Sequence, residues 1–90
     1  MSLAKFRSGR MVATANAAKH LTSRDIIVAV GRHLQGDWGD LGAEDRRSND
    51  RALVEGSRLL SAYRGENGTK FWIITEWDRS VTTILLPEDY

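Results

Sequence analysis

The chain has 90 residues and a net charge of +1, from 13 Lys and Arg against 12 Asp and Glu, so it has no overall attraction to nucleic acid or to an anionic membrane. It contains no cysteine, which excludes disulfides, zinc–thiolate sites and cysteine nucleophiles. No apolar run approaches the roughly 18 residues of a membrane span, and the first residues lack the apolar stretch of a signal peptide, so we expect a cytoplasmic protein without membrane contact.

The start of the chain predicts a short strand and a short helix. Residues 1–9 are expected to be disordered or partly derived from cloning. Residues 10–14 follow the turn signal Ser8-Gly9 and are apolar enough for a strand. The hydroxyl of Thr14 can then accept a free backbone amide, which favours a brief helix over residues 15–21.

Two longer helices follow. The first begins at Thr22 with a sequence typical of a capping box, ends near residue 34 before Gly36, and carries an apolar stripe that includes Ile26 and Val30. The second, over residues 43–55, is weakly amphipathic and is expected to lie on the surface.

Four carboxylates gather between and within these helices: Asp37, Asp40, Glu44 and Asp45. Oxygen-rich clusters can bind magnesium or calcium, but this spacing does not match a calcium-binding helix–loop–helix. Carboxylates are also favoured at the start of a helix, where the backbone dipole is positive. We therefore favour a solvated acidic loop, assign no metal ligand, and keep a metal site as a minor alternative.

The last third of the chain predicts an antiparallel meander of three strands, over residues 59–63, 71–75 and 81–86. The first turn contains Asn67-Gly68, the dipeptide best suited to a type I′ turn. Both faces of the middle strand carry large apolar side chains, so we expect the helices to cover one face and the chain termini or a second subunit to cover the other.

The aromatic and histidine side chains are interpreted mainly as packing residues. Trp72 and Trp77 are expected in the core, whereas Trp38, in a glycine-rich loop, fits either a packed residue or a contact residue. His20 and His33 lie on different helices without a serine or carboxylate arrangement typical of a triad, and we expect packing or exposure for each.

These elements predict one small α+β domain over residues 1–90: a short N-terminal strand, two or three helices, then the three-stranded antiparallel meander. The chain has no P-loop, dinucleotide-binding glycine pattern, nucleophile elbow or metalloprotease histidine pair. We assign no catalytic residue and no cofactor, and a non-enzymatic protein is favoured.

Several segments together resemble a family of short bacterial plasmid-related proteins. They are Gly36-Asp37-Trp38-Gly39-Asp40-Leu41, Glu44-Asp45, Asn49, Gly56–Tyr63, Trp72–Glu76, Asp78–Pro87 and Asp89-Tyr90. The resemblance implies an uncharacterised protein of plasmids and other mobile elements; some members are labelled as a type I restriction endonuclease or methylase subunit, a label that looks inherited from gene neighbours. It selects these candidate functional residues: Trp38, Asp40, Asp45, Asn49, Glu76, Asp78 and Arg79.

Two functions from different classes fit the sequence. The favoured one is a non-enzymatic accessory or binding protein of mobile elements, whose partner is another protein or a second copy of the chain, bound through the meander or its edge strand. The alternative is an RNA-cleaving toxin, because the element order is similar to that of ribosome-dependent mRNA interferases. Its candidate nucleic-acid contacts are Arg58, Tyr63, Arg64 and Lys70, although the charge of +1 does not favour nucleic acid.

Overall fold

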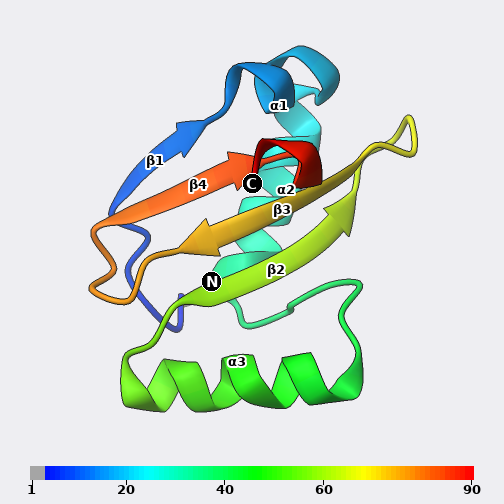
Figure 1. Cartoon of the computed structure of the whole chain (residues 1–90). Helices are drawn as coiled ribbons and strands as arrows, with labels where there is room; N and C mark the ends of the chain where they lie inside the picture. Colours follow the sequence, from blue (N-terminus) through cyan, green and yellow to red (C-terminus); the bar gives the residue numbers. More distant parts are fainter. Residues whose placement is uncertain (1–3) are drawn as a thin grey trace.

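The computed structural model describes residues 4–90 as an α+β domain with a four-stranded sheet, which confirms the predicted class (Figure 1). Helices α1 and α2 cover one face of the sheet, and α3 runs along one of its edges. The elements in chain order are β1 (Arg10–Ala13), α1 (Ala15–His20), α2 (Ser23–Leu34), α3 (Ala43–Glu55), β2 (Leu59–Arg64), β3 (Lys70–Thr75), β4 (Val81–Leu85) and the 3-10 turn η1 (Pro87–Asp89).

The sheet is mixed and is not a simple meander. Strands β2, β3 and β4 are antiparallel neighbours as predicted, but β1 adds to the outer side of β4 in parallel, so the order is β1-β4-β3-β2. Backbone hydrogen bonds hold both ends of β1, from Arg10 N to Ser80 O (3.0 Å) and from Thr14 N to Ile84 O (3.0 Å). This pairing joins segments about 70 residues apart, which no local pattern specifies.

The predicted helix ends are confirmed. The Thr14 hydroxyl accepts from Ala17 N (3.1 Å) at the start of α1. At the start of α2, Thr22 and Asp25 exchange the two hydrogen bonds of a capping box (3.0 and 3.1 Å). Gly36 follows α2 with a positive φ of 79°.

The turn between β2 and β3 differs from the prediction. A type I′ turn needs a positive φ at both central residues, but Gly68 has one (86°) and Asn67 does not. Gly68 N instead donates to Gly65 O (2.9 Å), which places a single left-handed glycine at the end of the turn.

The core has two parts. The larger lies between α1, α2 and the sheet and contains Phe71, Ile73 and Ile84, each at most 2% exposed. The smaller lies beneath α3 and contains Trp38 and Leu59. On the other face of β3, η1 lies against the strand and the Trp72 ring meets the Tyr90 ring (5.8 Å), so the C-terminal segment contributes the second cover that the sequence predicts.

Two aromatic predictions are resolved. Trp38 is packed, at 4% exposed, and stacks on Phe6 (6.3 Å). The expectation that Trp77 lies in the core is wrong, because it is 66% exposed. Strand β3 ends at Thr75, so the alternation that would have turned Trp77 toward the core no longer applies.

The segment before β1 packs against the domain over residues 4–9. Lys5 N donates to Leu34 O (2.8 Å), and Phe6 meets the ring of His33 edge-on (5.2 Å). The prediction of disorder or a cloning origin for residues 1–9 also included Met1–Leu3, which lie outside the described residues. Within residues 4–90, no helix is long and apolar enough to cross a membrane.

Candidate functional site

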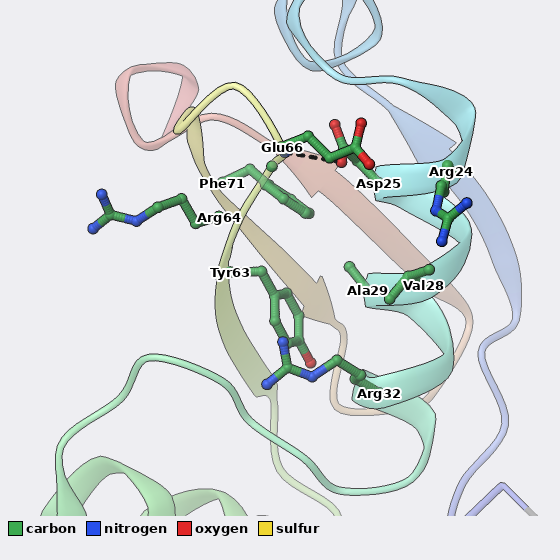
Figure 2. A pocket seen from close by; sticks show the side chains of 10 residues that line it. Arg24, Asp25, Val28, Ala29, Arg32, Tyr63, Arg64, Glu66 and Phe71 are labelled. Carbon is green, nitrogen blue, oxygen red and sulfur yellow. Dashed lines mark hydrogen bonds between the residues drawn. The ribbon is translucent and has the colours of Figure 1, made fainter.

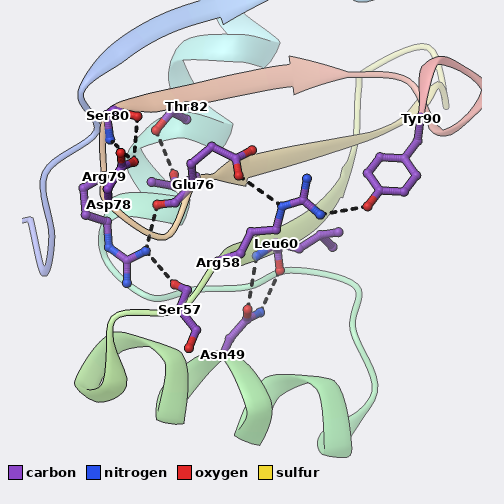
Figure 3. A network of polar contacts seen from close by, with 11 residues as sticks. Asn49, Ser57, Arg58, Leu60, Glu76, Asp78, Arg79, Ser80, Thr82 and Tyr90 are labelled. Carbon is purple, nitrogen blue, oxygen red and sulfur yellow. Dashed lines mark hydrogen bonds and ion pairs between the residues drawn. The ribbon is translucent and has the colours of Figure 1, made fainter.

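Arg79, in the turn between β3 and β4, joins that turn to the end of α3 (Figure 3). Its guanidinium donates to the carbonyls of Ser57 (2.6 Å), Glu76 (3.0 Å) and Ala52 (3.1 Å). Helix α3 has no basic residue in its last turn, so Arg79 supplies the positive charge that a helix C-terminus favours. Burial lowers the pKa of Arg79. This side chain is therefore used to hold the fold together.

The other two candidates in this turn are also hydrogen-bonded within the fold. Asp78 accepts from Ser80 N (3.1 Å) and Ser80 Oγ (2.6 Å), and these bonds lower its pKa, as befits a turn-forming carboxylate. Glu76 forms an ion pair with Arg58 (3.5 Å), which also donates to the Tyr90 hydroxyl (2.8 Å).

Asn49 covers the outer edge of β2. Its amide nitrogen donates to Leu60 O (2.6 Å) and its oxygen accepts from Leu60 N (3.1 Å), so one side chain satisfies both outward backbone groups of that residue. The next outward residue, Ala62, is satisfied by Trp38 O (3.1 Å) and Asp40 N (2.7 Å). Figure 3 shows Asn49 rising from α3 to the strand.

Glycine is required where the loop meets β2. Gly39 has a φ of 74°, and a Cβ there would lie 2.0 Å from the carbonyl oxygen of Ala62. The Trp38 indole donates to Asp50 (3.0 Å), which fixes the loop to α3. Trp38, Gly39 and Asn49 therefore all help to cover the edge of β2.

The acidic loop does not form a cluster of ligands. Asp37 is bound by Arg32 through two hydrogen bonds (2.7 and 3.2 Å), which lower its pKa. Asp45 lies with Asn49 beside a hollow of about 240 Å³. Within residues 4–90, no three His, Asp or Glu side chains are placed to hold one metal ion.

The candidates selected by the resemblance thus fall into two groups. Trp38, Asp40 and Asn49 meet at the edge of β2, with Asp45 beside them. Glu76 and Asp78 lie with Arg79 at the turn between β3 and β4. Both groups contact α3, since Asn49 is part of this helix and Arg79 donates to its Ala52 carbonyl. Within the described chain, no hydrogen bond or ion pair joins the two groups directly.

The candidate nucleic-acid contacts are also divided. Arg64 and Lys70 are directly opposite each other on β2 and β3 and line a hollow of about 450 Å³ with Trp72. Arg58 lies at the other end of β2 beside Tyr90. Tyr63 is 3% exposed and donates to Asp37 O (2.6 Å), and burial raises its pKa to about 12.

A further hollow, of about 280 Å³, lies between α2 and the hairpin of β2 and β3 (Figure 2). Arg32 lies over the Tyr63 ring (4.9 Å) and is held by Asp37, while Arg64 points away from the hollow. Asp25 accepts from Glu66 N (3.1 Å), which ties the start of α2 to the hairpin. Two of the charged side chains that line the hollow, Asp25 and Arg32, therefore already have partners within the fold.

A chain of buried hydrogen bonds crosses the core. Thr82 Oγ1 donates to Ser8 O (2.6 Å) and contacts Thr75 Oγ1 (2.7 Å), which contacts His33 Nε2 (2.8 Å). His33 Nδ1 contacts Ser61 Oγ (2.5 Å). The Ser8 carbonyl can only accept, so Thr82 uses its proton there and must accept from Thr75. Thr75 then has no proton left for His33, so Nε2 of His33 carries the proton and donates to Thr75. In the neutral ring Nδ1 is therefore the acceptor, and it accepts from Ser61.

His33, Ser61, Thr75 and Thr82 are all fully buried, so this Ser–His contact has no access to a substrate. Burial, with a smaller contribution from the Arg79 charge, lowers the pKa of His33 from 6.5 to about 4. The neutral ring is therefore a structural part of the core.

Strand β1 forms the other edge of the sheet and is open. In the parallel register, the backbone groups of Arg10 and Val12 face β4, so those of Met11 and Ala13 face outward. From residues 4–90, no hydrogen bond reaches these outward groups. Met11 is also 46% exposed. One edge of the sheet is thus covered and the other is available for pairing.

The neutral state of His33 predicts a loss of stability in mild acid. The pKa is lower in the folded protein (about 4) than in the unfolded chain (6.5), so the unfolded chain binds more protons and stability falls as the pH falls below 6.5. Between pH 7 and 5, the free energy of unfolding should drop by about 2 kcal/mol, measured by urea denaturation. His33→Gln should remove this dependence and His20→Gln should keep it; the reverse pattern would contradict the assignment.

The role of Asn49 predicts that a change between amide and carboxylate alters stability at position 49 and not at a nearby exposed position. Asn49→Asp replaces the amide donor by a carboxylate oxygen facing Leu60 O, so it should lower the free energy of unfolding by about 2 kcal/mol. Asp45→Asn, one turn earlier on the same face of α3 but exposed and without a bond to β2, should change it by less than about 0.5 kcal/mol. Equal effects in thermal or urea unfolding would show that Asn49 does not hold the strand edge.

No protein-family model matches the chain. The comparisons with curated proteins and with solved structures found no match either. The roles given above to the side chains accordingly rest on the geometry of this molecule.

Proposed function

We propose that the protein is a non-enzymatic binding protein that takes up one strand of a partner protein along the open edge of β1. The observation that carries the proposal is the contrast between the two edges of the sheet. The outward groups of Leu60 and Ala62 on β2 are all satisfied, whereas no hydrogen bond from residues 4–90 reaches those of Met11 and Ala13 on β1. Adding a strand to such an edge is a common mode of peptide recognition, in which backbone hydrogen bonds supply affinity.

The open edge is also well prepared for this role. Hydrogen bonds at Arg10 and Thr14 hold both ends of β1 on β4, and the Thr14 hydroxyl donates to Asp89 (2.7 Å). A partner strand would therefore meet a backbone that is already extended, which reduces the entropy lost on binding. The resemblance to plasmid-related proteins supports a place for this binding protein among the accessory proteins of mobile elements.

The RNA-cleaving alternative has weaker support. The Tyr63 hydroxyl is hydrogen-bonded in the core and has a pKa of about 12, so it is poorly suited to proton transfer at neutral pH. Arg64 and Lys70 are exposed and adjacent, and they are the residues that an RNA-binding role would use.

The proposed function predicts that proline on β1 acts according to the direction of the backbone N–H. Met11→Pro removes an outward N–H and keeps the ladder to β4, so the protein should fold but lose its partner. Val12→Pro removes an N–H that faces β4 and should lower stability. The measurement is photo-cross-linking in a bacterial host that expresses the protein, with the photo-reactive residue at position 13.

A matched control places the same photo-reactive residue at Val54, which is 88% exposed on α3. A protein adduct is expected from position 13 and not from position 54, and Met11→Pro should abolish it. An adduct that persists in folded Met11→Pro protein would argue against pairing at β1.

The alternative predicts toxicity, and the proposal predicts none. Induced expression in a growing bacterial host should leave growth rate and message levels unchanged. Growth arrest relieved by Arg64→Ala with Lys70→Ala, but not by Met11→Pro, would favour RNA cleavage and count against the proposed function.

A further inference from the structure

The charge of the chain is divided along its length. Residues 1–24 contain no Asp or Glu and five cations: Lys5, Arg7, Arg10, Lys19 and Arg24. The rest of the chain holds the other eight Lys and Arg with all twelve Asp and Glu, a net charge of −4. The net charge of +1 therefore conceals a positive segment, and β1 lies within it.

The charges beside β1 are available to a partner. Arg7 and Arg10 are both exposed, and the described structure gives neither an ion pair. The carboxylates at the two ends of β4 are occupied: Asp78 accepts from Ser80, and Asp89 accepts from Thr14, Asn16 and Leu86 N. The open edge is thus positively charged without a compensating carboxylate of its own.

The two faces of the edge differ. Met11 and Ala13 pair with Thr82 and Ile84, so their side chains point to the face that α2 covers, while Arg10 points to the opposite face. On the α2 side the edge itself is apolar: Met11 is 46% exposed, and Ala13 is exposed as well. A strand added to β1 would have alternate side chains against an apolar surface and against arginine.

We infer that the strand bound at this edge alternates acidic and apolar residues, with its acidic side chains on the Arg10 face and its apolar side chains on the Met11 face. This inference rests on the proposed function and specifies the chemistry of the partner. A second copy of the chain fits less well, because pairing β1 with β1 would bring two positive segments together. A partner paired with the covered edge of β2 is excluded by Asn49 and the loop at 38–40.

The test uses the full chain, labelled with ¹⁵N, and blocked eight-residue peptides that alternate glutamate with valine or lysine with valine. The glutamate peptide should shift the amide signals of Met11 and Ala13 and slow their hydrogen exchange, and the lysine peptide should not. The double substitution Arg7→Glu with Arg10→Glu should lower the affinity for the glutamate peptide about tenfold or more. Arg47→Glu with Arg51→Glu, on exposed positions of α3, is the matched control and should leave the affinity unchanged.

The outcomes separate the inference from the proposed function. If both peptides protect Met11 and Ala13 equally, or if the chain forms a dimer that Met11→Pro dissociates, pairing at β1 stands and the acidic partner is wrong. If millimolar peptide leaves both amides unchanged and the chain stays monomeric, both proposals fail. Binding of single-stranded DNA through Arg7 and Arg10, without protection of Met11 and Ala13, would also overturn both.

Discussion

The hydrogen-bond chain through His33 is the constraint on which the rest of the fold depends. It links α2, β2, β3, β4 and the segment before β1 through Ser61, Thr75, Thr82 and the Ser8 carbonyl, all by single contacts. A buried donor or acceptor left without a partner costs about 1–3 kcal/mol, so each link requires the others to be in register. In a domain of this size, where apolar burial is limited, such a network sets the relative position of the elements as well as their stability.

Local signals in the sequence were sufficient to predict the helices and the three long strands. The hydroxyl caps at Thr14 and Thr22, the glycine after α2 and the alternating apolar runs act within a few residues, and the structure confirms each of them. What the sequence could not specify depends on contacts between distant segments. The parallel pairing of β1 with β4 is the main case, and the exposure of Trp77 follows from where β3 ends.

The candidate site shows the same division. Residues selected by resemblance proved to lie at joints of the structure, because Asn49 satisfies the edge of β2 and Arg79 satisfies carbonyls at the end of α3. Two signals in the sequence could have indicated these roles: a helix with no basic residue in its last turn, and an asparagine on an otherwise charged helix. The positive segment before Asp25 was also readable from the sequence, although the total charge concealed it.

The position of β1 has a consequence for the order in which the molecule forms. The ribosome makes residues 10–13 about 70 residues before β4, the strand beside which they lie in the described sheet. During that interval β1 has two unpaired edges, and Ser8 has no threonine to bind. Contacts of such long sequence separation form late because closing the loop costs entropy before any contact repays it. The strand proposed to bind a partner is therefore also the strand whose neighbour in the sheet is synthesised last. Until β4 is made, β1 is open to incorrect pairing with other strands.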